Sequence, residues 1–500
     1  MKNKPLWERC FENIGLAFQN YRFKNIDTDY VHIRNYDLTE FRLKLGIFTP
    51  FYYIEDPVTF ENSQEFFELK GRSKAVFVIG ENPPGYKFMT PIVFINQKEL
   101  VDQTDKNKIK ELILSKLQEQ CTLDTLSPYE TDAVVFGDKF FGRRNDIDRI
   151  TTNETTNYVI FGSRRMGKTS LLKHLEYIYN NKKFSLDFSR PNSGKAIFLS
   201  CLGVHDLNSF QQLLIAVLAP SDYWKDSFQK LARKKKWEVL TQNYFKNLAL
   251  KYKKGILLLL DEIDAMIESS DCEEIVKFQR MLTTVGYRFI QTGYRAVWRE
   301  MQNHKGSFWN FSDPLHIAQF NKNDSLELIE KPMESMGIQL SNGVTQAIYQ
   351  ETGGIPNYIQ HYCTVIVSEA QFHDFRKIDK KIFGIIDGSP NFDRIVMNSI
   401  HQNIRFPEEK LIAYFAANNN KDNFSIFQIL DFCKSQKIDT ILYDDIRKSM
   451  DILIKMGFVQ TAGEDLYRFI APITKKALRK RNIDKNLAET VKILKTTTHD

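Results

Sequence analysis

One octapeptide dominates this sequence: Gly162-Ser163-Arg164-Arg165-Met166-Gly167-Lys168-Thr169. It follows the short apolar run Tyr158–Phe161, and the apolar spacing of Ser170–Leu175 behind it is helical. A strand, a loop bounded by glycines, Lys-Thr and a helix form the context that a phosphate-binding P-loop requires. By itself the octapeptide leaves one alternative open, a glycine-rich turn between a strand and a helix that binds nothing.

The residue types of this loop suit phosphate chemistry. Glycines let the backbone curl so that successive N–H groups point at phosphate oxygens, and the helix N-terminus adds partial positive charge. We expect the whole loop and the adjoining Ser170 to surround the phosphates. Lys168 would reach the β- and γ-phosphates, and the Thr169 hydroxyl would hold Mg²⁺.

A second motif supports this interpretation. The apolar run Ile256–Leu260 ends in Asp261-Glu262, with Asp264 close behind. Such a run predicts a buried parallel strand with carboxylates at its C-terminal tip, the edge where ligands bind in a doubly wound sheet. Asp261 is placed to hold Mg²⁺, directly or through water, and Glu262 to orient or deprotonate the attacking water. For Asp264, capping a helix explains the residue as well as function does. Together the motifs predict a nucleoside triphosphate site.

The composition of the chain limits the classes of protein to which this site can belong. The chain has 500 residues, 42% of them hydrophobic, and a net charge of +7. Roughly three domains are expected at this length, and the mild charge permits nucleic-acid contact without requiring it. The six cysteines are scattered with no CxxC pair, which excludes a zinc knuckle and favours reduced thiols. We predict a cytoplasmic protein with no signal peptide and no membrane partner, because the N-terminus lacks an apolar segment and Ile256–Leu260 cannot span a bilayer.

The expected fold class is α/β, with a parallel P-loop sheet, a helical lid, a winged helix and a small additional domain. We expect five parts along the chain: a small α/β sensor or effector domain at 1–125, a P-loop ATPase core at 126–320, a helical lid at 321–405, a winged-helix domain at 406–482 and a C-terminal tail at 483–500.

In the first part, strand patterns cover Phe48–Ile54, Ala75–Ile79 and Pro91–Ile95, and helical patterns cover Thr59–Lys70 and Lys106–Gln120. Glu68-Leu69-Lys70 matches half of a metal-nuclease motif, in which the carboxylate holds Mg²⁺ and the lysine stabilises the phosphate. Because this triplet lies in a helical period, a solvated helix face is the favoured interpretation.

In the core, further strands are expected at Lys195–Ser200, Arg288–Thr292 and Pro314–Ala318, separated by helices. This alternation predicts a parallel sheet with helices on both faces. The basic run Arg233–Lys236, followed by Trp237, favours a solvated helix face over a nucleic-acid contact.

The C-terminal pattern predicts three helices, Glu408–Phe415, Ile426–Cys433 and Tyr443–Met456, before a ribbon at Phe458–Phe469. Three helices and a two-stranded wing form a winged helix, which binds DNA in many proteins and clamps domains in others. The basic residues behind the wing favour DNA without requiring it; they are Lys475, Lys476, Arg479, Lys480 and Arg481.

The ordered set of motifs resembles bacterial STAND ATPases of the AAA+-like ASCE class, over about residues 126–475. The resemblance is carried by Phe140–Arg144, the P-loop, Leu260–Asp264, Phe289–Gly293 and Thr352–Tyr358. The first part of the chain lies outside it.

The resemblance implies further roles. Phe141, Gly142 and Arg143 would lie beside the adenine and ribose, and Thr292 would be the polar sensor near the γ-phosphate. Pro356 would pack on the base and report nucleotide state to the lid. Ordinary packing and helix initiation remain the alternative for Phe141 and Pro356. Adenine as the base rests on the resemblance alone.

Two departures from the family pattern concern arginines. No lid arginine that would sense the γ-phosphate is identifiable. No arginine finger is unambiguous either, although Arg295 and Arg299 follow the sensor strand and are candidates.

Three functions follow as hypotheses. The first is a slow ATPase switch in which ADP holds the lid and winged helix closed on the core, whereas ATP favours an open homo-oligomer. The alternative is a DNA-engaged loader or remodelling ATPase that binds duplex through the winged helix and the basic tail. The third, a scaffold that binds ATP without turnover, is disfavoured by Glu262.

Overall fold

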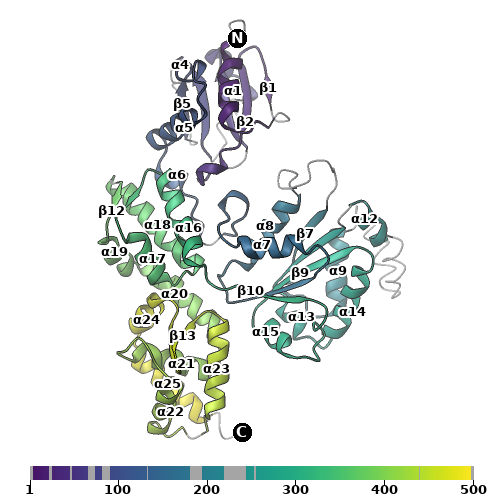
Figure 1. Ribbon diagram of the computed structural model, residues 1–500, viewed down its shortest axis with the longest axis vertical. Helices are drawn as coiled ribbons and strands as arrows, with labels where there is room; N and C mark the ends of the chain where they lie inside the picture. Colours follow the sequence, from purple (N-terminus) through teal and green to yellow (C-terminus); the bar gives the residue numbers. More distant parts are fainter. Residues whose placement is uncertain are drawn as a thin grey trace. The chain divides into compact units, whose positions relative to one another are not determined.

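The structure is a computed structural model. It describes residues 4–21, 25–45, 48–65, 74–81, 91–131, 133–180, 194–218, 244–252, 255–374, 376–438 and 440–496. The chain forms two compact units (Figure 1). The first comprises 1–131, 323–348 and 359–388, and the second comprises 132–322, 349–358 and 389–500.

The first unit contains a five-stranded sheet in the order β1-β2-β3-β4-β5. Its strands are β1 (Ile26–Asp27), β2 (Val31–Tyr36), β3 (Thr49–Ile54), β4 (Val76–Gly80) and β5 (Ile92–Asn96). β1, β2 and β3 pair antiparallel, whereas β3, β4 and β5 are parallel. The strands predicted near 48–54, 75–79 and 91–95 are confirmed to within about one residue, because their apolar residues are buried in the sheet.

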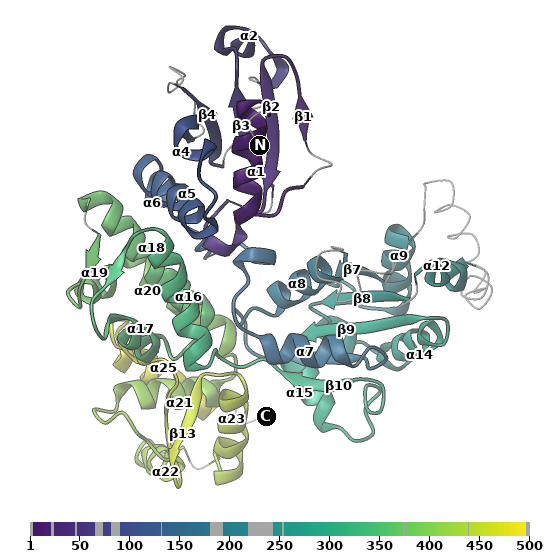
Figure 2. The same cartoon turned by 45° about the horizontal axis from the view of Figure 1, so that its top comes forward.

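Helices cover both faces of this sheet. Figure 2 shows α1 (Leu6–Ala17), α4 (Gln97–Val101) and α5 (Lys106–Gln120) lying side by side over one face. On the other face Phe60 of α2 (Pro57–Glu61) packs with Val31, Ile33, Tyr52, Val76 and Val78. The Asp56 side chain caps α2, which ends at Glu61; within the predicted helix Thr59–Lys70, residues 59–61 and 64–65 are helical. Residues 66–70, with the Glu68-Leu69-Lys70 motif, lie outside the described residues.

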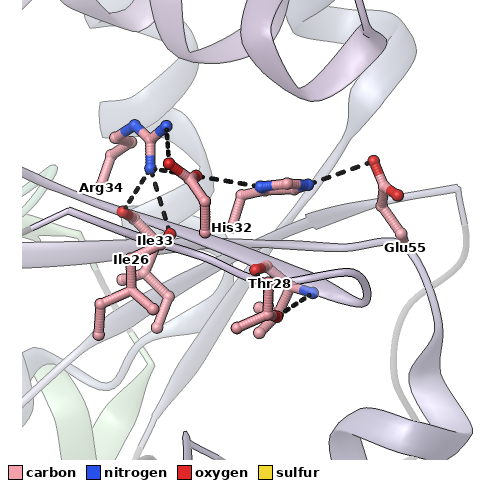
Figure 3. A network of polar contacts seen from close by, with 8 residues as sticks. Ile26, Thr28, His32, Ile33, Arg34 and Glu55 are labelled. Atoms are coloured by element: carbon pink, nitrogen blue, oxygen red, sulfur yellow. Dashed lines mark hydrogen bonds and ion pairs between the residues drawn. The ribbon is translucent and has the colours of Figure 1, made fainter.

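A polar network fastens the edge of the sheet to α1 (Figure 3). His32 lies between two carboxylates, with Nδ1 3.0 Å from Asp27 Oδ1 and Nε2 3.4 Å from Glu55 Oε1. Its ring stacks on Trp7 at 4.0 Å between centroids, and Arg34 Nη1 lies 2.6 Å from Asp27. The network therefore joins α1, β1, β2 and the end of β3.

Helices complete the first unit: α6 (Leu123–Leu126), α16 (Lys322–Ser335), α17 (Val344–Thr352), α18 (Pro356–His373) and α19 (Ile382–Gly388), with the short strands β11 (Gln339–Leu340) and β12 (Lys377–Ile378). Side-chain hydrogen bonds link α16 and α18 to residues 118–130. Tyr129 Oη donates to Ile329 O at 3.1 Å, and Leu123 N–H donates to Gln371 Oε1 at 2.6 Å.

The second unit is built on a parallel sheet in the order β10-β6-β9-β8-β7. Its strands are β6 (Tyr158–Phe161), β7 (Lys195–Ser200), β8 (Ile256–Asp261), β9 (Tyr287–Gly293) and β10 (Asp313–His316). One strand, β9, separates the P-loop strand from the strand that ends in Asp261, the arrangement of an ASCE P-loop core. The predicted α/β fold class is confirmed. The basic run Arg233–Lys236 lies outside the described residues.

Helices lie on both faces of this sheet (Figure 1). α7 (Arg144–Thr152) and α8 (Lys168–Asn180) lie on one side, and α9 (Leu207–Leu218), α13 (Asp264–Ile267), α14 (Cys272–Thr283) and α15 (Arg295–Gln302) on the other. A short helix, α12 (Lys246–Leu250), precedes β8. Buried Leu258, Phe289, Phe210 and Phe278 belong to one core cluster.

The C-terminal region has the arrangement of a winged helix. After α20 (Pro390–Asn403) come α21 (Pro407–Asn418), α22 (Ile426–Ser435), α23 (Tyr443–Lys455) and the antiparallel wing β13 (Val459–Gly463) and β14 (Leu466–Phe469). α24 (Pro472–Arg479) and α25 (Ile483–Thr496) follow. α25 lies within the tail expected at 483–500, and it packs on α21. In the described part of the chain, no helix is long and apolar enough to cross a membrane.

A tight contact between two backbone segments generates a stability prediction. Gly255 has a φ of 68°, and a Cβ there would lie 2.1 Å from Gly286 O. Gly203 has a similar φ of 82°, but nothing lies within 4 Å of its Cβ position. Both Gly→Ala changes should cost about 1–2 kcal/mol for left-handed backbone. Gly255→Ala should cost more because of the clash. Urea unfolding compares the two variants, and equal losses would contradict the close approach.

Candidate phosphate-binding site

The carboxyl ends of three neighbouring strands assemble the site. β6 leads into the P-loop, β8 ends at Asp261, and β9 carries Thr292 one residue before its end. Parallel pairing places these ends at one edge of the sheet. The two sequence motifs and Thr292 are therefore brought together, as predicted.

The P-loop backbone depends on its glycines. A Cβ at Gly162 would lie 2.3 Å from Ile317 O, so only glycine lets the two segments approach. Gly167 has a φ of 86° and Arg165 a φ of 67°, both left-handed, just before α8 begins at Lys168. The loop consequently turns its backbone sharply toward the helix N-terminus, as a phosphate cradle requires.

Lys168 lies folded onto its own loop. Its Nζ donates to Gly162 O at 2.9 Å and to Ser163 O at 2.8 Å. Burial lowers the pKa of Lys168 to about 8, although Asp261 and Asp264 act in the opposite direction. The ammonium group is thus held by neutral carbonyl oxygens, which a phosphate can replace with stronger charged acceptors.

Asp261 connects the end of β8 to the start of α8 and to β9. The carboxylate is buried, and its Oδ2 accepts from Thr169 Oγ1 at 2.8 Å. Its Oδ1 accepts from the fully buried Thr292 hydroxyl. A carboxylate beside a hydroxyl is the oxygen donor set that Mg²⁺ prefers. In the described residues, no cluster of three His, Cys, Asp or Glu side chains could hold a metal, so a Mg²⁺ ion here would take further oxygens from water or phosphate.

Glu262 faces solvent, unlike Asp261. Its φ of 59° is left-handed, which turns the chain sharply after the buried strand. Glu262, Lys168, Thr292 and Arg164 line one cavity of about 360 Å³. The cavity places a carboxylate near the groups expected to hold a terminal phosphate, where a water molecule could be activated.

Asp264 is the first residue of α13, so it does not cap the helix that follows its own strand, which was the alternative that the sequence left open; it caps another helix instead. Its Oδ2 accepts from Tyr294 N–H at 2.8 Å and its Oδ1 from Ala296 N–H at 3.0 Å. The capped helix is α15, which follows the sensor strand. Asp264 therefore fixes the direction in which the chain leaves β9.

The Phe141-Gly142-Arg143 motif lies against the back of the P-loop. Arg143 Nη2 donates to Met166 O at 3.0 Å and to Ala318 O, and its guanidinium carbon lies 4.9 Å from the centre of the Phe320 ring. Phe141 is buried, and Gly142 has a left-handed φ of 66°. The motif thus stabilises the P-loop through the hydrogen bond from Arg143 to Met166 O.

The remaining predicted residues meet other segments of the second unit. Arg165 Nη1 donates to Asn357 Oδ1 at 3.1 Å, next to the buried Pro356 at the start of α18. Ser170 Oγ accepts from Val135 N–H at 3.3 Å. Met166 and Ser163 are buried.

The two arginine-finger candidates differ in environment. Arg295 is 7% exposed and forms a bidentate pair with Glu409, at 2.5 Å and 2.7 Å. Arg299 keeps an exposed side chain, 2.6 Å from Glu268. The Arg295 guanidinium is therefore already paired with a residue of its own chain. Of the two candidates, only Arg299 presents its guanidinium to the surface.

Sequence reasoning missed two residues that contact the site, Asn403 and Glu409. Asn403 Oδ1 accepts from the P-loop N–H of Arg164 at 3.2 Å. Glu409 holds Arg295, three residues after Thr292. Neither residue belongs to a motif, and a lone Asn at a helix end or a Glu in a first helical turn carries no signal of such a partner.

No protein-family model matches the chain, and no curated protein matches it either. Among solved structures, the Walker-type ATPase of Pyrococcus abyssi is 14% identical with a TM-score of 0.47, covering 71% of this chain and 100% of that one. The ORC2 protein of Aeropyrum pernix, solved with ADPNP and ADP, is 11% identical with a TM-score of 0.47, covering 75% and 98%. Cdc6p of Pyrobaculum aerophilum is 13% identical with a TM-score of 0.35, covering 74% and 98%.

All three TM-scores lie below 0.5, so these likenesses carry no conclusion about this chain. Its assignment to the P-loop fold rests on its own strand order and on the residues gathered at the carboxyl edge of the sheet.

Proposed function

We propose that this protein binds ATP with Mg²⁺ and hydrolyses it slowly, as a conformational switch of the STAND type. Nucleotide state would control whether the C-terminal helices stay fastened to the core, and release would allow self-association. The observation that carries the proposal is the buried ion pair between Arg295, directly behind the sensor strand, and Glu409 in the first helix of the winged helix.

The site residues divide the chemistry among them. Lys168 and the P-loop N–H groups would hold the β- and γ-phosphates, and Thr169 with Asp261 would hold Mg²⁺. Bound Mg²⁺ would neutralise negative charge on the phosphates. Glu262 would orient or deprotonate the attacking water, and Thr292 would sense the terminal phosphate. On the family resemblance, Phe141, Gly142, Arg143 and Pro356 would surround the adenine.

The ion pair couples the site to the C-terminal helices. Arg295 and Glu409 are 7% and 1% exposed, and Arg295 Nη2 also donates to Asn403 O. Glu409 Oε2 accepts in addition from Arg405 N–H at 2.9 Å. Removing charges from water is costly, but bidentate bonds and further donors offset that cost only while all the partners stay in place. Such a contact is either fully formed or broken, as a two-state switch requires.

The contacts of the basic cluster expected to bind DNA do not favour the loader alternative. Lys475 Nζ lies 3.0 Å from Asp422, Lys476 Nζ 2.9 Å from Glu351 and Lys480 Nζ 3.0 Å from Asp393. Arg479 donates to Ala417 O and to Asn419 O, at 2.7 Å each. These side chains are therefore engaged within the chain. Among the described residues, Arg481 is the one member of the basic cluster whose side chain makes no such contact. The tip of the wing carries Glu464 and Asp465, which repel phosphate.

Turnover tests the proposed function. Purified protein should hydrolyse ATP slowly, with the same rate in the presence and absence of duplex DNA, because its basic cluster is engaged internally. Glu262→Gln, which keeps the phosphate ligands but lacks the base, should bind ATP without turnover and accumulate as oligomers. Strong stimulation by DNA, or a Glu262→Gln protein that stays monomeric with ATP, would refute the switch.

Lys168 generates a pH prediction. Burial holds its pKa near 8 in the nucleotide-free protein, and a bound phosphate would raise it because it favours the charged amine. The bound form then holds more protons, so ATP affinity should fall as pH rises above about 8, by up to about tenfold per unit. Calorimetry in buffers of different ionisation enthalpy should detect proton uptake above pH 8.

Two variants control this measurement. Lys168→Ala should lose nucleotide binding. Lys168→Arg, to the extent that it binds, should lack the pH dependence, because a guanidinium stays charged. A wild-type affinity that is flat from pH 7 to about 10 would contradict the role of Lys168.

The ion pair predicts a gain of activity on disruption. Arg295→Met or Glu409→Gln should weaken the attachment of the C-terminal helices, by about 3–5 kcal/mol for the loss of one buried partner. ATP turnover and ATP-dependent oligomers, measured by light scattering, should both increase. Arg299→Met, which breaks only the exposed pair with Glu268, is the matched control and should change stability by less than about 1 kcal/mol. Lower stability with unchanged turnover would make the pair merely structural.

A further inference from the structure

Asn403 is placed where a nucleotide-dependent contact can be made and broken. It is the last residue of α20 and is 4% exposed. Its Oδ1 accepts two hydrogen bonds, from Arg164 N–H at 3.2 Å and from Tyr294 Oη at 3.0 Å. The first donor belongs to the P-loop and the second directly follows the sensor strand. One carboxamide oxygen thus contacts both the P-loop and the segment that follows the sensor strand.

The orientation of this carboxamide is set by its surroundings. Asn403 Nδ2 donates to Ser399 O at 2.8 Å and to Ser399 Oγ at 3.2 Å. Burial raises the pKa of Tyr294, so its hydroxyl keeps its proton and can donate. The Arg164 N–H can only donate and the Ser399 carbonyl oxygen can only accept, so a flipped amide would lose both of these contacts, whereas the two hydroxyls could exchange donor and acceptor roles. The oxygen must therefore face the P-loop.

Arg164 lies at the end of the site where a terminal phosphate is expected. It lines the same cavity as Glu262 and Thr292, the residues proposed to position water and to sense that phosphate. The N–H group of Arg164 is bonded to a neutral acceptor, and the ammonium of Lys168 is bonded likewise to two carbonyl oxygens. Phosphate oxygens are charged acceptors and form hydrogen bonds about twice as strong as neutral ones.

We infer that Asn403 distinguishes ATP from ADP by holding the Arg164 N–H that the terminal phosphate would otherwise take. This inference rests on the proposed function. ATP binding breaks the hydrogen bond between Arg164 N–H and Asn403 Oδ1. ADP has no phosphate at that position and leaves this bond intact.

Displacement of Asn403 reaches the C-terminal helices directly. The same residue accepts from Arg295 Nη2 through its main-chain oxygen, and Tyr294 Oη lies 3.0 Å from that oxygen as well. Glu409 follows in the next helix and holds the same Arg295. Movement of Asn403 therefore disturbs the contacts around the buried ion pair, so the state of the phosphate site is passed to α20 and α21.

Two substitutions at Asn403 should shift nucleotide preference in opposite directions. Asn403→Leu keeps the shape but cannot accept a hydrogen bond, so ATP affinity should rise about 3- to 10-fold, the worth of one net hydrogen bond. Asn403→Asp binds the N–H more strongly and repels phosphate, so ATP affinity should fall about tenfold or more. ADP affinity should stay within about twofold in both variants. Ser399→Ala removes the Oγ contact of the amide nitrogen but keeps its bond to Ser399 O, so it should shift preference in the direction of Asn403→Leu, but less.

The experiment is calorimetric titration of the full chain with Mg²⁺ and either ATP or ADP, in a Glu262→Gln background that prevents turnover. The ratio of the two dissociation constants is the readout, because a general loss of stability would weaken both nucleotides alike. An unchanged ratio in both Asn403 variants, or parallel changes for ATP and ADP, would overturn the inference. Ser399→Ala keeps the test decisive if a substitution of Asn403 prevents folding.

Lys168→Ala separates this inference from the proposed function. If the Glu262→Gln parent binds both nucleotides and Lys168→Ala binds neither, an unchanged ratio in the Asn403 variants refutes the role of Asn403 alone. If the parent binds neither nucleotide, the proposed function and the inference both fail.

Discussion

The second unit depends on one buried carboxylate. Asp261 ends the strand β8 and accepts hydrogen bonds from Thr169 at the start of α8 and from Thr292 near the end of β9. A buried carboxylate left without partners would be costly, so these hydroxyls and their backbones are held where they are. The P-loop, the acid strand and the sensor strand consequently keep one geometry. Every chemical role proposed for Lys168 and Glu262 presupposes that geometry.

A short series of contacts leads from this carboxylate to the C-terminal helices. Thr292 is followed at once by Gly293 and Tyr294, whose N–H is capped by Asp264. Arg295 comes next and is held by Glu409. Because each contact is buried and polar, a partial displacement leaves groups unsatisfied, and the favourable states are those with all of them formed or all replaced. That property makes the region suited to switching.

The first unit is organised by a different polar network. His32 is placed between Asp27 and Glu55 and is covered by Trp7, so polar contacts and ring stacking join the sheet edge to α1. The acid-x-lysine triplet considered for nuclease chemistry lies outside the described residues, and the sensor or effector role expected for residues 1–125 stays a prediction. Two of its helices, α16 and α18, are joined to residues 118–130 by side-chain hydrogen bonds.

The sequence by itself determined the strands, the P-loop and the acid motif. Each is encoded by contiguous residues, and apolar periodicity reports directly which residues are buried. It also left Asp264 open between function and capping, and the structure shows a cap for α15.

The tertiary structure alone decided which residues far apart in the sequence contact each other. Arg164 and Asn403 are 239 residues apart, and Arg295 and Glu409 are 114 apart. Periodicity predicts that a side chain is buried but not which group it meets. For the same reason the sequence could not show that the basic residues around Lys475 lie beside Asp422, Asp393 and backbone carbonyls.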